Sequence, residues 1–191
     1  MISSAIAQSM ATEQGRLFEM SCDLALRCAG FQLDNVRVTF KQIGVEVDIT
    51  ATNKFGIPFY FTCKGSMRGT RPGARRTDTL KKAICDAFLL SQAGLTPVIL
   101  LTSHIPDTGS GRAMLNSLPR DVLFDALNPW IHGERLCWLA IADKTALDTD
   151  MRYSLRELCE TNWPAVKQQL SNSAQTRFHF PQLELFSQQV A

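Results

Sequence analysis

The sequence has none of the cysteine spacings that mark a zinc site or a disulfide framework, because none of its 6 cysteines forms a CxxC pair. We therefore expect small buried thiols in a reducing compartment. No apolar run is long enough to span a membrane, and the N-terminus has no charged segment followed by an apolar one. These absences predict a cytoplasmic protein without a signal peptide. The cysteines are Cys22, Cys28, Cys63, Cys85, Cys137 and Cys159.

A large excess of charge of one sign is also missing, since 20 Lys and Arg residues against 18 Asp and Glu residues leave a net charge of +2. Composition alone therefore does not indicate a nucleic-acid-binding protein. The basic residues are nevertheless concentrated between positions 54 and 82, where Asp78 is the only acid. This segment is either a phosphate-contacting surface or a solvated loop. If it contacts DNA, the expected residues are Arg68, Arg71, Arg75, Arg76 and Lys81.

Hydrophobic periodicity predicts two helices, from Thr12 to about Cys28 and from Thr77 or Asp78 to Gln92. Alternating or continuous apolar residues predict three strands between the helices and one after them, at residues 36–41, 45–50, 59–64 and 98–101. A turn is expected at residues 53–56 and a loop at residues 65–76. The order αβββαβ predicts an α/β fold, with a mixed central sheet flanked by helices.

Spacings of three and four residues also predict the buried side of each helix. In the first helix these residues are Leu17, Phe18, Cys22, Ala25 and Cys28. In the second they are Leu80, Ala83, Ile84, Ala87, Phe88 and Ser91. Residues 1–10 carry no such pattern and are expected to form a loose leader.

The second half of the chain carries shorter patterns. We expect a flexible turn at residues 107–111 before a helix at Ala113, and His104 as a hydrogen-bonded residue at the start of a loop, with phosphate contact or proton transfer as the alternative. The remaining expected elements are a strand at 136–141, helical pieces at 153–160 and 163–170, and a polar linker at 171–176. The chain would thus comprise a domain of residues 1–170 and a tail of residues 171–191.

Polar side chains alternate along two neighbouring predicted strands. Glu46 and Asp48 share one face of the first, and Thr62 and Lys64 share one face of the second. If these faces meet, Asp48, Thr62 and Lys64 converge, with Glu46 near the edge. Carboxylate oxygens are the ligands that Mg²⁺ prefers, and a nearby lysine can orient water or neutralise charge on a phosphate.

An acidic residue at the end of one strand and a lysine on the next resembles the PD-(D/E)XK, or restriction-endonuclease-like, nucleases. The resemblance covers roughly residues 12–105 and extends through CKGS, a basic loop, RRTDTLKKA and a strand into TSH. It implies a restriction-endonuclease-like core and a DNA endonuclease that depends on Mg²⁺ or Mn²⁺. Asp48 would then be a metal ligand and Lys64 a catalytic residue. Many members act as homodimers to cut both strands.

One position departs from the family pattern, which usually has Asp or Glu two residues before the lysine, where this chain has Thr62. Glu46, on the same face as Asp48, or Glu19, in the helix from which the family often supplies a glutamate, could replace the missing charge. Each also has an ordinary interpretation as a solvated charge. Two functions therefore stay open. One is an active endonuclease in restriction, repair or phage defence. The other is an inactive DNA- or protein-binding module, or a subunit that needs a partner.

The sequence Gln182-Leu183-Glu184-Leu185-Phe186 resembles the bacterial sliding-clamp-binding pentapeptide, whose usual form is QL(S/D)LF. This resemblance implies that Leu185 and Phe186 fill an apolar pocket while Gln182 fixes the register. The alternative is a terminal strand or helix that packs Leu183, Leu185 and Phe186 on the protein's own core.

Overall fold

The computed structural model describes residues 4–66 and 73–149. The chain divides into two compact units, residues 1–150 and 151–191, and all described residues belong to the first. The predicted domain boundary at residue 170 therefore stays a prediction. Several other predicted features also lie outside the described residues: Arg68, Arg71, Cys159, the helical pieces at 153–160 and 163–170, the linker and the tail peptide 182–186.

A mixed sheet of five strands forms the centre of the first unit, in the spatial order β1-β2-β3-β4-β5. The first three strands are antiparallel, whereas β4 and β5 each run parallel to the preceding strand. The strands are β1 (Gln32–Phe40), β2 (Val45–Thr52), β3 (Pro58–Lys64), β4 (Val98–Thr102) and β5 (Asp125–Leu127). The predicted α/β class, mixed sheet and αβββαβ order are confirmed.

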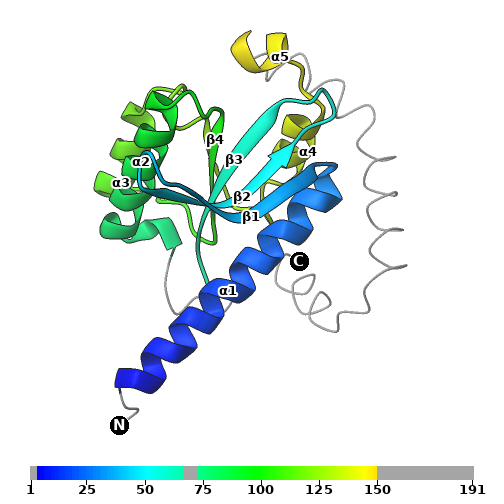
Figure 1. Cartoon of the computed structure of the whole chain (residues 1–191). Coiled ribbons are helices and arrows are strands. Elements are labelled where there is room, and N and C mark those ends of the chain that lie inside the picture. The colour runs from blue at the N-terminus through cyan, green and yellow to red at the C-terminus, as the bar shows by residue number, and fades with distance from the viewer. Residues whose placement is uncertain (1–3, 67–72, 150–191) are drawn as a thin grey trace, which may run out of the picture. The chain divides into compact units, whose positions relative to one another are not determined.

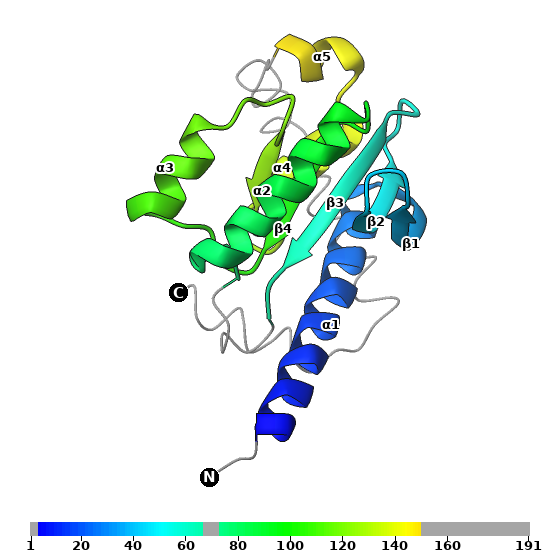
Figure 2. The same cartoon turned by 60° about the vertical axis from the view of Figure 1, so that its left-hand side comes forward.

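Helices cover both faces of this sheet (Figures 1 and 2). Helix α1 (Ser4–Ala29) and helix α4 (Gly133–Ile141) pack against each other on one face. Helix α2 (Thr77–Gln92) lies on the other face against β2, β3 and β4, with α3 (Gly109–Ser117) beside it. The short elements are η1 (Gly73–Arg75) and α5 (Lys144–Thr149). None of the described helices is both long and apolar enough to cross a membrane.

Apolar side chains fill the space between the sheet and the helices. An aromatic cluster joins Phe31 to β3, with ring centroids 5.2 Å from Phe59 and 5.4 Å from Phe61. On the face of α2, Leu80 and Leu90 pack into a cluster with strand residues such as Leu100. Full burial of each such side chain contributes about 1.5–3 kcal/mol to folding. This core holds the strands that carry the predicted site.

The hairpin between β2 and β3 is held in place by Asn53. Its side-chain oxygen accepts the backbone N–H groups of Phe55 and Ile57, which closes the predicted turn. Its amide nitrogen donates to the backbone oxygens of Leu139 and Ala142 at the end of α4. The hairpin is therefore fixed against a helix from the second half of the chain.

The strand predicted at residues 136–141 is wrong, because these residues belong to helix α4. Leu136 to Ala140 are all buried, and a short run that is apolar on every side has no period that separates a helix from a strand. The fifth strand is instead β5, whose three residues are too few to give a sequence pattern.

Several predicted details of the helices are also wrong. Helix α1 begins at Ser4, so there is no loose leader up to residue 10, and α3 begins at Gly109 within the predicted turn. Leu17 and Phe88 are 40% and 48% exposed, although the helical spacing predicts that both are buried. Cys85, on the outer side of α2, is exposed rather than buried. Among the described residues the buried line is narrower than predicted, with Phe18, Cys22 and Leu26 in α1 and Leu80, Ala83, Ala87 and Leu90 in α2.

Candidate active site

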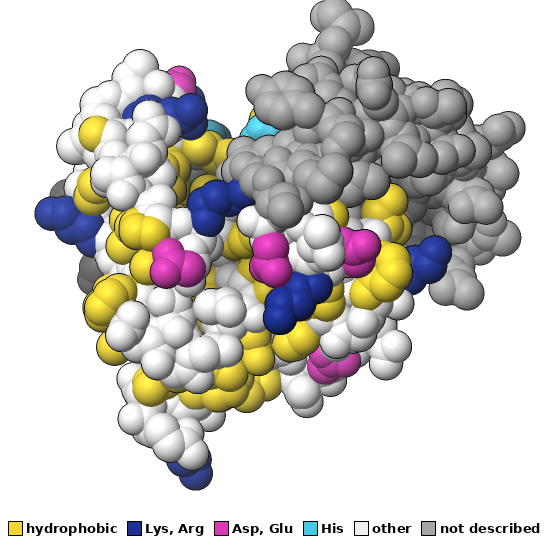
Figure 3. Space-filling view, turned by 90° about the horizontal axis from the view of Figure 1, so that it is seen from above, with side chains coloured by type: hydrophobic (Ala, Val, Ile, Leu, Met, Phe, Trp, Pro, Cys, Tyr) yellow, Lys and Arg dark blue, Asp and Glu magenta, His cyan; other side chains and the backbone are white. Residues whose placement is uncertain are grey.

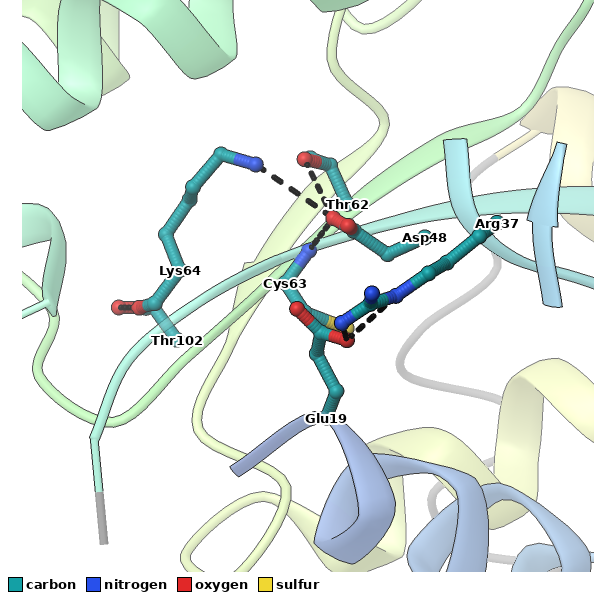
Figure 4. Close-up of polar contacts among 7 residues, drawn as sticks. All are labelled: Glu19, Arg37, Asp48, Thr62, Cys63, Lys64 and Thr102. Atoms are coloured by element: carbon teal, nitrogen blue, oxygen red, sulfur yellow. Dashed lines mark hydrogen bonds and ion pairs between the residues drawn. The ribbon is translucent and has the colours of Figure 1, made fainter. Parts of the chain in front are cut away.

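Asp48, Thr62 and Lys64 converge at the point where β2 and β3 part (Figure 4). Backbone pairing of the two strands extends from Thr52–Pro58 only to Ile49–Phe61. Beyond this pair, the Cys63 N–H donates to the Asp48 carboxylate instead of to a backbone oxygen of β2. Its Oδ2 accepts the Cys63 N–H at 2.6 Å, the Thr62 hydroxyl at 3.3 Å and the Lys64 ammonium at 3.4 Å. The predicted convergence is present.

The charged pair at this point is largely screened from water. The Asp48 and Lys64 side chains are only 11% and 19% exposed. All three donors reach Oδ2, and no described residue donates a hydrogen bond to Oδ1. Asp48 is thus held by fixed donors on one oxygen while the other remains available as a ligand.

The end of β3 is fixed by Thr102, the partner of Lys64 on β4. The Thr102 hydroxyl donates to the backbone oxygen of Lys64 at 2.7 Å and accepts the Ala74 N–H at 2.9 Å. A Cβ on Gly73 would lie 2.5 Å from this hydroxyl, and its φ of +52° also favours glycine. The close approach of η1 to Thr102 therefore requires glycine at position 73. The contacts of Thr102 in turn fix the position of the Lys64 backbone.

The Glu19 carboxylate lies near this site but forms an ion pair with Arg37. Its Oε2 accepts hydrogen bonds from Nη2 of Arg37 at 2.6 Å and from Nε at 3.2 Å. The hydrogen bond to Glu19 raises the pKa of Arg37, and the charges of Glu46 and Asp48 raise it further. Glu46 itself is exposed and paired with Thr39 at the edge of the β1–β2 hairpin.

The three acids that the sequence suggested as ligands do not gather around one point. Within residues 4–66 and 73–149, no group of three or more His, Cys, Asp or Glu side chains lies close enough to hold a metal ion. Asp48 is placed as expected, whereas Glu19 pairs with Arg37 and Glu46 acts on the same cation only through its charge. A metal at Asp48 therefore needs a further ligand from elsewhere.

Asp86 on α2 is a carboxylate that the sequence analysis missed. It lies beside Ala83 and Ala87, which are wholly buried against the sheet. Burial raises the pKa of Asp86, while the positive charges of Lys64 and Lys82 lower it and the charge of Asp48 raises it. Asp86 therefore lies in the electrostatic field of the Asp48–Lys64 pair. No described residue forms a hydrogen bond or ion pair with it. In the sequence, Asp86 stands out only as a charged residue next to the buried residues of its helix. That position does not show which strands of the sheet it lies near.

The two described arginines of the basic segment, Arg75 and Arg76, are exposed and each forms an ion pair. Arg75 forms an ion pair with Asp107 at 3.2 Å, and Arg76 forms one with Asp78 at 3.0 Å. Exposed pairs of this kind contribute only about 0–1 kcal/mol, so these arginines are free to exchange partners. On the face drawn in Figure 3, the described Lys and Arg side chains lie apart, among Asp and Glu side chains. Lys81 is exposed on α2.

The segments that follow β3 and β4 are tied together near Lys64. The Ser66 N–H donates to the Ser103 hydroxyl at 3.3 Å, and that hydroxyl lies 3.0 Å from Nδ1 of His104. His104 is therefore hydrogen bonded at the start of a loop, as predicted. Asn128 donates to the backbone oxygen of Ser103, which joins the loop after β5 to the same edge.

The site thus combines one carboxylate, one hydroxyl and one lysine at the parting of two strands, with a second carboxylate nearby on a helix. This arrangement can bind a divalent cation weakly and can stabilise negative charge on a bound anion. No family model, no curated protein and no solved structure matches the chain.

Proposed function

We propose that the protein is a metal-dependent DNA endonuclease of the restriction-endonuclease-like type, with an active site centred on Asp48 and Lys64. The observation that carries the proposal is the mostly buried Asp48–Lys64 pair, whose second carboxylate oxygen accepts no hydrogen bond from a described residue. Ion pairs removed from water add little net stability, because desolvation offsets most of their attraction. Charges kept under such conditions are typical of sites that do chemistry.

The residues present fit Mg²⁺ or Mn²⁺ held through few protein ligands. Mg²⁺ commonly binds one or two carboxylates and completes its shell with water and substrate phosphate. Oδ1 of Asp48 is the first ligand in this proposal, and Asp86 supplies the negative charge that Thr62 cannot. When bound, the metal would neutralise phosphate charge and lower the pKa of a coordinated water.

The neighbouring groups orient Asp48 and stabilise negative charge on the substrate phosphate. The Thr62 hydroxyl and the Cys63 N–H hold Asp48 in one orientation. Hydrolysis adds a water oxygen to phosphorus, breaks one phosphodiester P–O bond and releases an alcohol. The Lys64 ammonium would donate a hydrogen bond to a non-bridging phosphate oxygen, on which negative charge accumulates.

Incubation of the purified protein with supercoiled plasmid in Mg²⁺, Mn²⁺ or EDTA tests this proposal. We expect nicking or linearisation only with a metal, and its loss in Lys64→Met and Asp86→Asn. Asp78→Asn is the matched control, because Asp78 is an exposed aspartate on the same helix. Full activity in Lys64→Met would remove the lysine from the mechanism, and full activity in Asp86→Asn would remove the second carboxylate.

A second candidate function is a nuclease-fold module that binds DNA or a protein without cutting. It is favoured by Thr62 at the usual acidic position and by the lack of a three-ligand cluster among the described residues. Such a module would bind DNA equally well in Mg²⁺ and in EDTA and would cut in neither. A homodimer and attachment to a sliding clamp through residues 182–186 are compatible with both functions and remain proposals.

A further inference from the structure

Arg37 has an unusual backbone directly across from Asp48. The pairs Val36–Ile49 and Val38–Val47 place Arg37 opposite Asp48 in the β1–β2 ladder. Its φ is +55°, and no other described non-glycine residue has a positive φ. This left-handed conformation costs roughly 1–2 kcal/mol for a residue with a Cβ. Such strain is concentrated at functional sites.

The side chain of Arg37 is aimed by Glu19 on helix α1. Two donors of the guanidinium, Nε and Nη2, converge on one oxygen of Glu19, while Nη1 makes no hydrogen bond to a described residue. The Arg37 side chain is 54% exposed and that of Glu19 is 24% exposed. Figure 4 shows this pair below Asp48, with the Lys64 ammonium on the opposite side of the Asp48 carboxylate. A cation with free donors is thus presented to solvent at the edge of the proposed active site.

A purely structural role does not account for this geometry. An ion pair as exposed as Arg37–Glu19 stabilises a protein by about 0–1 kcal/mol. The backbone strain of about 1–2 kcal/mol is at least as large, so the pair gives no net stability. Arginine has a planar fork of donors that matches a phosphate, and Nη1 of Arg37 has no partner among the described residues.

We infer that Arg37 binds a backbone phosphate of the nucleic acid next to the one attacked, and that Glu19 is its positioning residue and not a metal ligand. This inference rests on the proposed function, because it names a contact to the same substrate. It also explains why Glu19 pairs with a guanidinium although the sequence suggested it as a metal ligand.

The test is binding of a fluorescent DNA duplex, measured by anisotropy in EDTA at several salt concentrations, so that no cleavage is needed. We expect Arg37→Ala to weaken binding about tenfold or more, the loss of one charge-assisted hydrogen bond. The log–log salt slope should fall in magnitude by about 0.9. Arg37→Lys should restore the slope but not the full affinity, and Glu19→Gln should lower affinity while keeping the slope.

Arg27→Ala is the matched control, because the Arg27 side chain is 58% exposed, against 54% for Arg37, and is paired with Asp23 on the same helix as Glu19. Unchanged affinity and slope in Arg37→Ala, or equal losses in Arg27→Ala, would overturn the inference. Wild-type protein that does not bind DNA would overturn both the inference and the proposed substrate. Binding that depends on Arg37, without cleavage in any metal, would support the inference and refute the nuclease.

Discussion

Replacing Asp48 by alanine and by asparagine separates its structural role from its chemical role. Alanine removes the acceptor of the Cys63 N–H, a buried amide that would be left without a partner at a cost of about 1–3 kcal/mol. It also leaves the Lys64 ammonium without its counter-ion. Breaking a fully buried pair costs roughly 3–5 kcal/mol. Because Lys64 keeps some access to water, we expect the loss of its counter-ion to cost only about 1 kcal/mol. We therefore expect Asp48→Ala to lower the free energy of unfolding by about 2–4 kcal/mol.

Asparagine keeps a carbonyl oxygen for the Cys63 N–H and loses only the charge. We expect Asp48→Asn to cost about 1 kcal/mol, which leaves the protein folded. The measurement is urea denaturation of both variants. Asp34→Ala on β1 is the control, because Asp34 accepts an exposed hydrogen bond from Thr52 and its loss should change stability by less than about 0.5 kcal/mol. If the alanine and asparagine variants were equally stable, Asp48 would not hold the end of β3.

Asp86, Arg37 and Cys85 can each be tested by one further measurement. Because burial raises the pKa of Asp86, the folded state binds this proton more tightly than the unfolded state, and stability falls as pH rises above the unfolded value of about 3.9. Asp86→Asn should therefore be more stable than the wild type at pH 7, with no gain left below about pH 4, and a loss of stability at pH 7 would contradict this. Arg37→Gly should be about 1 kcal/mol more stable than Arg37→Ala, since glycine adopts a positive φ freely, and equal stability in urea would argue against the strained backbone. A thiol reagent applied to folded protein should modify Cys85 before Cys22 and Cys63, and peptide mapping showing the reverse order would mean that α2 faces another way.

The sequence was sufficient for the parts of the fold that have a clear period. Alternation along β2 and β3 placed Asp48, Thr62 and Lys64 together, because neighbouring strands have only two faces. Helix α4 was predicted as a strand because its buried residues, Leu136 to Ala140, are consecutive and show no helical period. Segments of this kind are decided by packing rather than by period.

The surroundings of Asp48 could not be predicted, for a different reason. Strand propensity gives no hint of the positive φ at Arg37, so its contact with Glu19 was not foreseen. Asp86 approaches the site through the rotation of α2 about its axis, which a sequence pattern specifies only to within one or two residues. Both features depend on how elements far apart in the chain pack together.

The proposed role of Asp48 as a metal ligand is most directly tested by the single-turnover cleavage rate of an end-labelled DNA duplex in Mn²⁺, measured for Asp48→Asn beside the wild type. Asp48→Asn is the right variant because it should remain folded while it loses the proposed metal ligand. We expect the wild type to cut and the rate constant to fall by at least about a hundredfold in Asp48→Asn. A folded Asp48→Asn protein that cuts at the wild-type rate would contradict the account.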